Sequence, residues 1–260
     1  MKSKEELVAS SKKFGWIAGL LLLAMIVLSA IGKKESSPAT EVVVEVAPLE
    51  GGKLLINEKD VLEMVGTVYG YTLEGRPTGQ IDLQRIEKML ENDPFVLNAD
   101  VFLNARNSVN IRVQQREPVL RIIDNNALNY YLDKDGVKMP VSKRAAAHVM
   151  VATGNIPPHD PGFLERKRHL LKEVFLLSQM LREDAFFNAM IEQIHVSNQG
   201  EMTLVPKIGD QKIFFGKLAD ADKKLEKLRI FYQEGMPYEG WRKYKSIDVR
   251  YAGQIVCKKR

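Results

Sequence analysis

A long apolar run near the start of the chain is the clearest feature of its hydrophobic pattern. Residues Phe14–Ile31 contain no charged residue and no proline. At about 1.5 Å of rise per residue, this run reaches roughly 27 Å as a helix, which is close to the hydrocarbon thickness of a bilayer. Lysine pairs flank it at positions 12–13 and 33–34. We therefore expect a single transmembrane helix over residues 14–32.

The lysines around the run predict its orientation. Lysines at positions 2, 4, 12 and 13 precede it and two follow closely, which favours a cytoplasmic N-terminal tail at residues 1–13 and export of the rest. A cleavable signal peptide is one alternative, but its apolar region is usually only about 7–15 residues, and Ala30-x-Gly32 matches an Ala-x-Ala-like site only loosely. A buried core helix is another, but the run has no polar face. We favour an uncleaved anchor.

After a polar linker at residues 33–40, the pattern predicts a compact α+β domain over residues 41–118. Asn57 and Asp82 each precede an apolar stripe at helical spacing, and both can cap a helix. Alternating β-branched runs predict strands, and helices are expected to cover one face of a three-stranded sheet. The expected elements are a strand at 41–46, a helix from Asn57 to Gly66, a helix from Asp82 to Asn92, and strands at 96–103 and 108–114.

The remaining residues, 119–260, predict a strand-rich β domain with helices on one side. Asp160-Pro161 is typical of a helix start, and Asp220 can cap a last helix. Short β-prone runs separated by glycine and asparagine turns predict a largely antiparallel sheet. The expected strands are 119–123, two strands around the turn at 133–136, and 191–197, 201–206, 211–215, 246–251 and 254–258.

The charge and cysteine content limit the possible functions. The formal net charge is +5, but the first 40 residues carry +3 and the last three carry +3, so residues 41–257 carry −1. A nearly neutral body does not offer the basic surface that nucleic acids require. The single cysteine, Cys257, excludes an internal disulfide and a multi-thiolate metal site.

The sequence contains no complete motif for catalysis or metal binding. Gly216-Lys217 lacks the upstream glycine and the following Ser or Thr of a phosphate loop, and the turn at 133–136 lacks the further acidic positions of a calcium loop. The four histidines are scattered, and no Gly-x-Ser-x-Gly elbow occurs. We therefore predict no enzymatic activity, no metal and no cofactor.

Several segments resemble those of a known family. The segment DPFVLNADVFLNARNSVNIRVQQREPV is similar to the end of a polypeptide-transport-associated (POTRA) domain, with Pro94-Phe95 before a strand and the triplet Arg116-Glu117-Pro118 at its close. The segments YYLDKDGVKMP, FFGK and IDVRY follow in the order seen in the bacterial cell-division family FtsQ, also called DivIB. The chain thus resembles that family over nearly its whole length.

The resemblance implies a non-enzymatic scaffold in the cell inner membrane, single-pass type II, with periplasmic C-terminal domains and enrichment at the division septum. It implies recruitment of small coiled-coil partners similar to FtsB and FtsL through the distal domain, by strand addition at an open sheet edge. The expected partner-binding residues are Arg250, Tyr251, Gly253, Gln254, Ile255 and Val256.

Two other functions remain open from the sequence. One is a POTRA-containing envelope protein that assists polypeptide export or outer-membrane assembly, although such proteins usually carry several POTRA units or a barrel of about ten-residue strands. The other is a membrane-tethered envelope hydrolase, since acid–base pairs leave little trace in a sequence.

Overall fold

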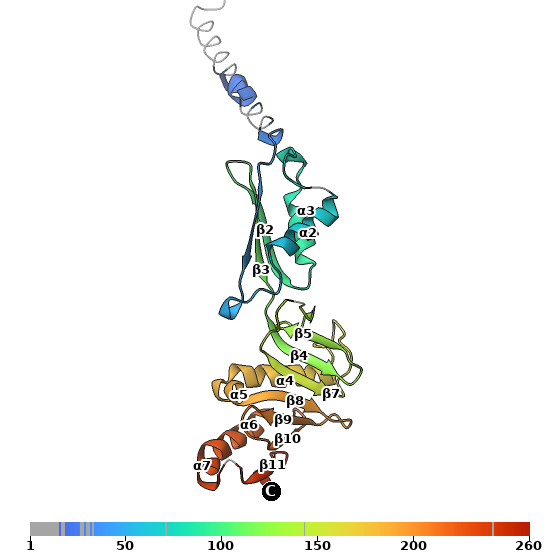
Figure 1. Ribbon diagram of the computed structural model, residues 1–260, viewed down its shortest axis with the longest axis vertical. Coiled ribbons are helices and arrows are strands. Elements are labelled where there is room, and N and C mark those ends of the chain that lie inside the picture. Colours follow the sequence, from blue (N-terminus) through green and yellow to red (C-terminus); the bar gives the residue numbers. More distant parts are fainter. Residues whose placement is uncertain are drawn as a thin grey trace, which may run out of the picture. The chain divides into compact units, whose positions relative to one another are not determined.

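The computed structural model describes residues 16, 19–26, 29, 32, 34–70, 72–142, 144–240 and 242–260 (Figure 1). The described positions of the apolar run are helical and exposed. Among the described residues, no helix combines the length and apolar character needed to cross a bilayer. Phe14 and part of the predicted transmembrane helix lie outside these residues, and the anchor stays a prediction.

The chain forms two compact units. The first contains Met1–Pro48 and Ile56–Gln115, and the second contains Leu49–Leu55 and Arg116–Arg260. The chain thus leaves the first unit at Pro48, returns at Ile56 and leaves again after Gln115. The short 3₁₀ turn Glu50–Gly52 lies in the segment that belongs to the second unit.

The first unit is a three-stranded sheet in the order β1-β3-β2, with β1 parallel and β2 antiparallel to β3. Figure 1 shows α2 and α3 together on one face of this sheet. The strand, helix, helix, strand, strand order is the predicted one. The elements are β1 (Val42–Ala47), α2 (Glu58–Tyr69), α3 (Leu83–Glu91), β2 (Val96–Leu103) and β3 (Val109–Gln115).

Helices α2 and α3 both begin at the predicted capping residues, Asn57 and Asp82. Asn57 Oδ1 accepts from Asp60 N (3.0 Å) while Asp60 Oδ2 accepts from Asn57 N (2.8 Å), a complete capping box. Asp82 Oδ1 accepts from the N–H of Arg85 (3.0 Å). Helix α2 runs past the predicted end at Gly66 and stops at Gly70, which adopts a left-handed conformation (φ 67°).

The second unit contains a nine-stranded mixed sheet in the order β12-β11-β10-β9-β8-β7-β4-β5-β6. Strands β4, β7 and β8 are mutually parallel neighbours, β10 and β11 are parallel, and the other pairs are antiparallel. The strands are β4 (Pro118–Asp124), β5 (Asn129–Asp133), β6 (Lys138–Pro140), β7 (Met150–Gly154), β8 (Ile191–Val196), β9 (Met202–Pro206), β10 (Lys212–Gly216), β11 (Tyr244–Asp248) and β12 (Val256–Lys259).

The helices of the second unit differ from the predicted ones. Helix α4 (Leu170–Glu183) begins ten residues after the expected start at Asp160, because the intervening segment folds into turns that bury Phe163 completely. A short helix, α5 (Ala185–Met190), follows. Asp220 occupies the N-cap position of α6 (Ala221–Ile230), but its side chain makes no capping hydrogen bond and pairs with Lys223 instead (3.0 Å). The helical path continues through a π-helical turn, Phe231–Gly235, into α7 (Met236–Glu239).

Candidate partner-binding edge

Strand β12 forms one edge of the nine-stranded sheet. It pairs antiparallel with β11, with Asp248 opposite Val256 and Ile247 opposite Cys257. In the part of the chain that the structure describes, no strand lies on its other side. The sequence predicted a strand over 254–258, and the observed strand begins two residues later, so Gln254 and Ile255 belong to the preceding loop.

The backbone of β12 alternates between its neighbour and the open side. The N–H of Arg260 donates to Lys243 O (3.1 Å), which directs Arg260 toward β11. Because successive residues of a strand point their backbone groups to opposite sides, Val256 also faces β11. The N–H and C=O groups of Cys257 and Lys259 therefore face outward. Val256 therefore does not offer its backbone groups to the open side.

The side chains of β12 alternate as well. Cys257, and Ile255 just before the strand, pack against the core of the unit, whereas Val256 is 46% exposed and Lys258 is exposed. Burial raises the pKa of the Cys257 thiol, which favours its neutral and less reactive form. Cys257 thus acts as a small apolar residue that holds the strand against the core.

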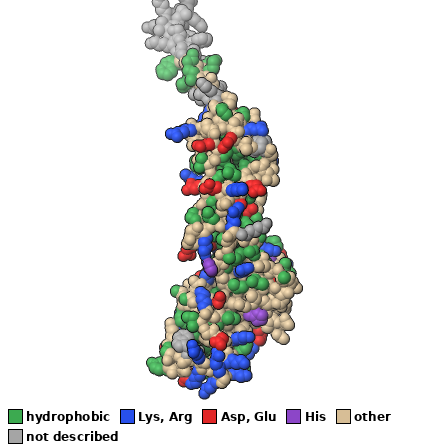
Figure 2. Space-filling model, in the orientation of Figure 1, with side chains coloured by type: hydrophobic (Ala, Val, Ile, Leu, Met, Phe, Trp, Pro, Cys, Tyr) green, Lys and Arg blue, Asp and Glu red, His purple; other side chains and the backbone are tan. Residues whose placement is uncertain are grey.

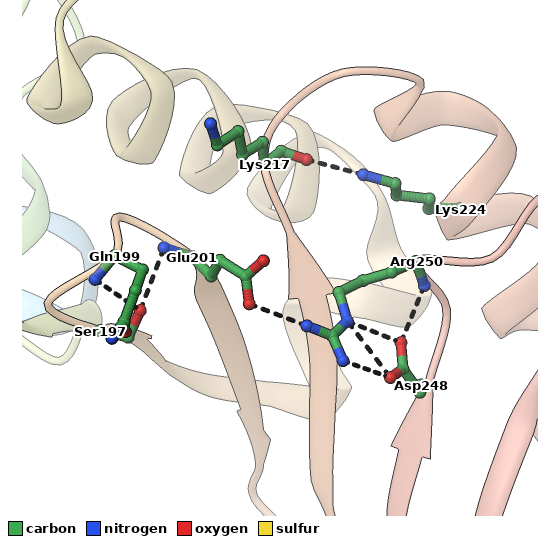
Figure 3. A network of polar contacts seen from close by, with 7 residues as sticks. All are labelled: Ser197, Gln199, Glu201, Lys217, Lys224, Asp248 and Arg250. Carbon is green, nitrogen blue, oxygen red and sulfur yellow. Dashed lines mark hydrogen bonds and ion pairs between the residues drawn. The ribbon is translucent and has the colours of Figure 1, made fainter.

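Arg250, just after β11, is held by two carboxylates of its own unit (Figure 3). Its guanidinium donates to Asp248 through Nη2 (2.6 Å) and Nε (2.9 Å), and through Nη1 to Glu201 (2.8 Å). It also lies over the ring of Phe214, 5.5 Å from the centroid. Arg250 therefore ties the end of β11 across β10 to the start of β9.

Asp248 and Arg250 each favour the charged form of the other. Burial by itself would raise the pKa of Asp248, but the hydrogen bonds and charge of Arg250 outweigh it, and the pKa lies below its usual value. The hydrogen bond to Asp248 in turn raises the pKa of Arg250. Glu201 is positioned by a turn, in which Ser197 Oγ accepts from the N–H of Glu201 (3.2 Å; Figure 3).

Lys227 of α6 organises the loop between β11 and β12. Its Nζ donates to the carbonyl oxygens of Val249 (3.1 Å), Tyr251 (2.5 Å) and Gln254 (3.3 Å). Three carbonyl groups that no neighbouring strand pairs with are thereby satisfied by one ammonium group. The ring of Tyr251 remains 50% exposed. Lys227 thus positions the loop, while the Tyr251 ring is available to a partner.

Basic side chains gather around this edge. Figure 2 shows Lys and Arg concentrated at the end of the second unit that carries the C-terminus. Arg260 pairs with Asp210 (2.8 Å). The other basic residues on or beside β11 and β12 are Arg242, Lys243, Lys245, Lys258 and Lys259. An edge of this charge favours an acidic partner segment.

Comparison with known proteins places the chain in a family. The sequence profile described as "FtsQ/DivIB, C-terminal related" matches residues 117–258, more than half of the chain. The chain belongs to this FtsQ/DivIB family. A POTRA-like domain profile matches residues 39–114, so the predicted resemblance is confirmed for both units.

A curated relative agrees with this assignment. Over 186 residues the chain is 27% identical to the cell division protein FtsQ of Rhodothermus marinus. The aligned region covers 68% of this chain and 66% of that protein. The chain thus spans just under two thirds of the length of the curated relative that it matches.

The structure brings together residues that the sequence analysis did not connect. Glu201 and Lys227 precede Arg250 by 49 and 23 positions, and neither lies in a recognisable motif. Gly216, at the end of β10, allows the Arg250 side chain to lie close, because a Cβ there would be 3.0 Å from Arg250 Cδ and Cγ. Among the described residues, no cluster of three or more His, Cys, Asp and Glu could hold a metal ion.

Proposed function

We propose that this FtsQ/DivIB-family chain is a non-enzymatic scaffold of bacterial cell division that binds its partners by strand addition at β12. The partners are small coiled-coil division proteins of the FtsB and FtsL type. The observation that supports this proposal best is the position of β12 at the end of the sheet, with the backbone groups of Cys257 and Lys259 facing outward.

The residues around β12 have distinct parts in this proposal. A partner strand takes its backbone hydrogen bonds from Cys257 and Lys259, and Val256 and Tyr251 offer exposed apolar contacts beside it. Gly253 (φ 70°) permits the turn that leads into β12. Of the residues expected to touch the partner, Arg250, Gln254 and Ile255 act mainly by holding this edge in place.

A pair of proline substitutions tests the strand addition. Cys257→Pro removes an outward N–H, which edge strands tolerate, and should weaken partner binding by about 1–3 kcal/mol while the unit stays folded. Lys258→Pro is the matched control, because its N–H faces β11 and its loss should destabilise the sheet itself. Binding is measured by titration of the purified FtsB- and FtsL-like proteins, and folding by circular dichroism.

Tyr251→Ala provides an independent test of the same surface. If the ring is a buried anchor in the complex, its removal should cost about 2 kcal/mol or more of binding. Folded Cys257→Pro and Tyr251→Ala variants that both bind with wild-type affinity would exclude β12 as the partner site.

The membrane topology is part of the proposal. A type II anchor with a cytoplasmic tail predicts that protease added to spheroplasts removes the residues beyond about position 40 and spares the tail, in line with the lysine distribution. Recovery of a soluble, shortened protein that begins near Gly32 would contradict an uncleaved anchor.

Depletion of the protein distinguishes division from export. A division scaffold should leave filaments without septa when it is depleted, and a fluorescent fusion should concentrate at the septum. Loss of outer-membrane proteins with normal septation would support the alternative function in polypeptide export.

A further inference from the structure

In the described part of the chain the two sheets have four edge strands. Strand β12 is the edge that the proposed function assigns to the division partners. Strand β6 spans only Lys138–Pro140 and ends in a proline, which hinders pairing with another strand. Short length, proline and lysine are common means by which proteins block their sheet edges. The other two edges, β1 and β2, belong to the first unit.

Two glutamates of α3 cover the edge of β2. The outward N–H of Val101 donates to Glu87 Oε1 (2.8 Å), and the outward N–H of Ala99 donates to Glu91 Oε1 (3.5 Å). An incoming strand would have to displace both carboxylates before it could accept from these groups. The β2 edge is therefore closed by side chains of the same unit.

The β1 edge has no such cover in the described part of the unit. Glu41 O accepts from the N–H of Val109 in β3 (2.9 Å), so alternation along the strand directs the backbone groups of Val42, Val44 and Val46 outward. Figure 1 shows α2 and α3 over a face of the sheet. Its sequence, VVVEVA, contains neither lysine nor proline.

We propose that β1 pairs antiparallel with β1 of a second copy of this chain. In the register that places Val44 opposite Val44 of the other copy, Val42 comes opposite Val46. The outward N–H and C=O groups of all three residues then find partners. The contact is isologous, as expected for a two-fold dimer.

The charge pattern of β1 favours pairing with a second copy of the chain, in the register that places Val44 opposite Val44. Glu45 is the only charged residue of the strand, and it already pairs with Arg112 of β3 (3.4 Å). In the proposed register Glu45 lies opposite Val43, so no like charges meet, and valine–valine pairs line the other face. Cross-strand β-branched pairs of this kind stabilise sheets. A neutral, self-complementary edge thus fits a second copy of itself.

Charge variants at position 43 test the register. Val43 is 43% exposed, so polar substitutions there leave the fold intact. Val43→Glu places a carboxylate opposite each Glu45 and should raise the dimer dissociation constant about tenfold, whereas Val43→Lys should lower it or leave it unchanged. Leu97→Glu, at a 37% exposed position of the covered β2 edge, is the matched control and should have no effect.

The measurement is sedimentation equilibrium of the full chain in detergent micelles. Every variant contains the same N-terminal apolar run, so differences between the two Val43 variants report on the strand. Equal effects of Val43→Glu and Val43→Lys, or a chain that is monomeric at every concentration tested, would overturn the proposal.

Disulfide trapping gives a second measurement that does not depend on equilibrium affinity. In a Cys257→Ser background, Val43→Cys combined with Glu45→Cys places thiols opposite each other across the two-fold axis at a non-hydrogen-bonded pair, where Cα atoms are about 4.5 Å apart. Mild oxidation should give a covalent dimer on non-reducing gels. Absence of this dimer, while the folded chain stays reduced, would also refute the β1 contact.

Discussion

Replacement of Arg250 distinguishes an internal support from a partner contact. In Arg250→Met the bonds to Asp248 and Glu201 and the contact with Phe214 are lost together. The Arg250 side chain is 37% exposed, so each ion pair is screened and contributes about 0.5–1 kcal/mol, with a similar amount from the ring contact. We expect the free energy of unfolding of the isolated chain to fall by about 1–3 kcal/mol.

The assay is urea denaturation of the purified chain without any partner, followed by fluorescence and circular dichroism. Tyr251→Ala is the comparison, because an exposed ring should change this stability by less than about 0.5 kcal/mol. A double-mutant cycle with Glu201→Gln should give a coupling energy of about 0.5–1 kcal/mol. An unchanged stability of Arg250→Met would show that the network contributes nothing to the free chain, and Arg250 would then be a partner anchor.

Three further predictions concern other parts of the second unit. Lys227→Met should speed hydrogen exchange at the amides of β12 with less than about 2 kcal/mol of global destabilisation, because its bonds to the loop are local; unchanged exchange would contradict its positioning role. Gly216→Ala should lower thermal stability more than Gly253→Ala, since both have positive φ but only at Gly216 would the new Cβ meet Arg250. Burial, Arg166 and His159 lower the pKa of His169. The unfolded chain therefore binds the proton more tightly, and the free energy of unfolding should fall as pH drops below about 6.5. Denaturation curves of His169→Gln should show a weaker dependence of stability on pH between about pH 7 and 5.

The sequence predicted the first unit closely because its signals are local. Asn57 and Asp82 lie within three residues of the groups they cap, and the strand pattern of 109–115 alternates regularly. The second unit depends on distant pairings. Strand β7 was missed because it is short and pairs in parallel with β4 and β8. Parallel strands are not joined by a hairpin turn, so the sequence around β7 carries no turn signal.

The edge strand was predicted from the sequence, but the direction of its backbone groups was not. A β-prone segment at the chain end indicated an edge strand, and β12 is one. Which backbone groups face outward depends on register, and a shift of one residue reverses the choice between Val256 and Cys257. The roles of Lys227 and Glu201 arise only from tertiary contact, so they could not be predicted from spacing in the sequence.

The path of the chain between the units affects how the protein can be divided. Gln115, the last residue of β3, donates through Nε2 to Ala47 O (2.8 Å) and accepts through Oε1 from Ile56 N (3.2 Å), so it joins both ends of the segment that belongs to the second unit. A cut after Gln115 would therefore leave Leu49–Leu55, which belongs to the second unit, on the N-terminal piece. A fragment that begins at Arg116 would lack this segment of its own unit, so the two units cannot be separated completely by a single cut of the chain.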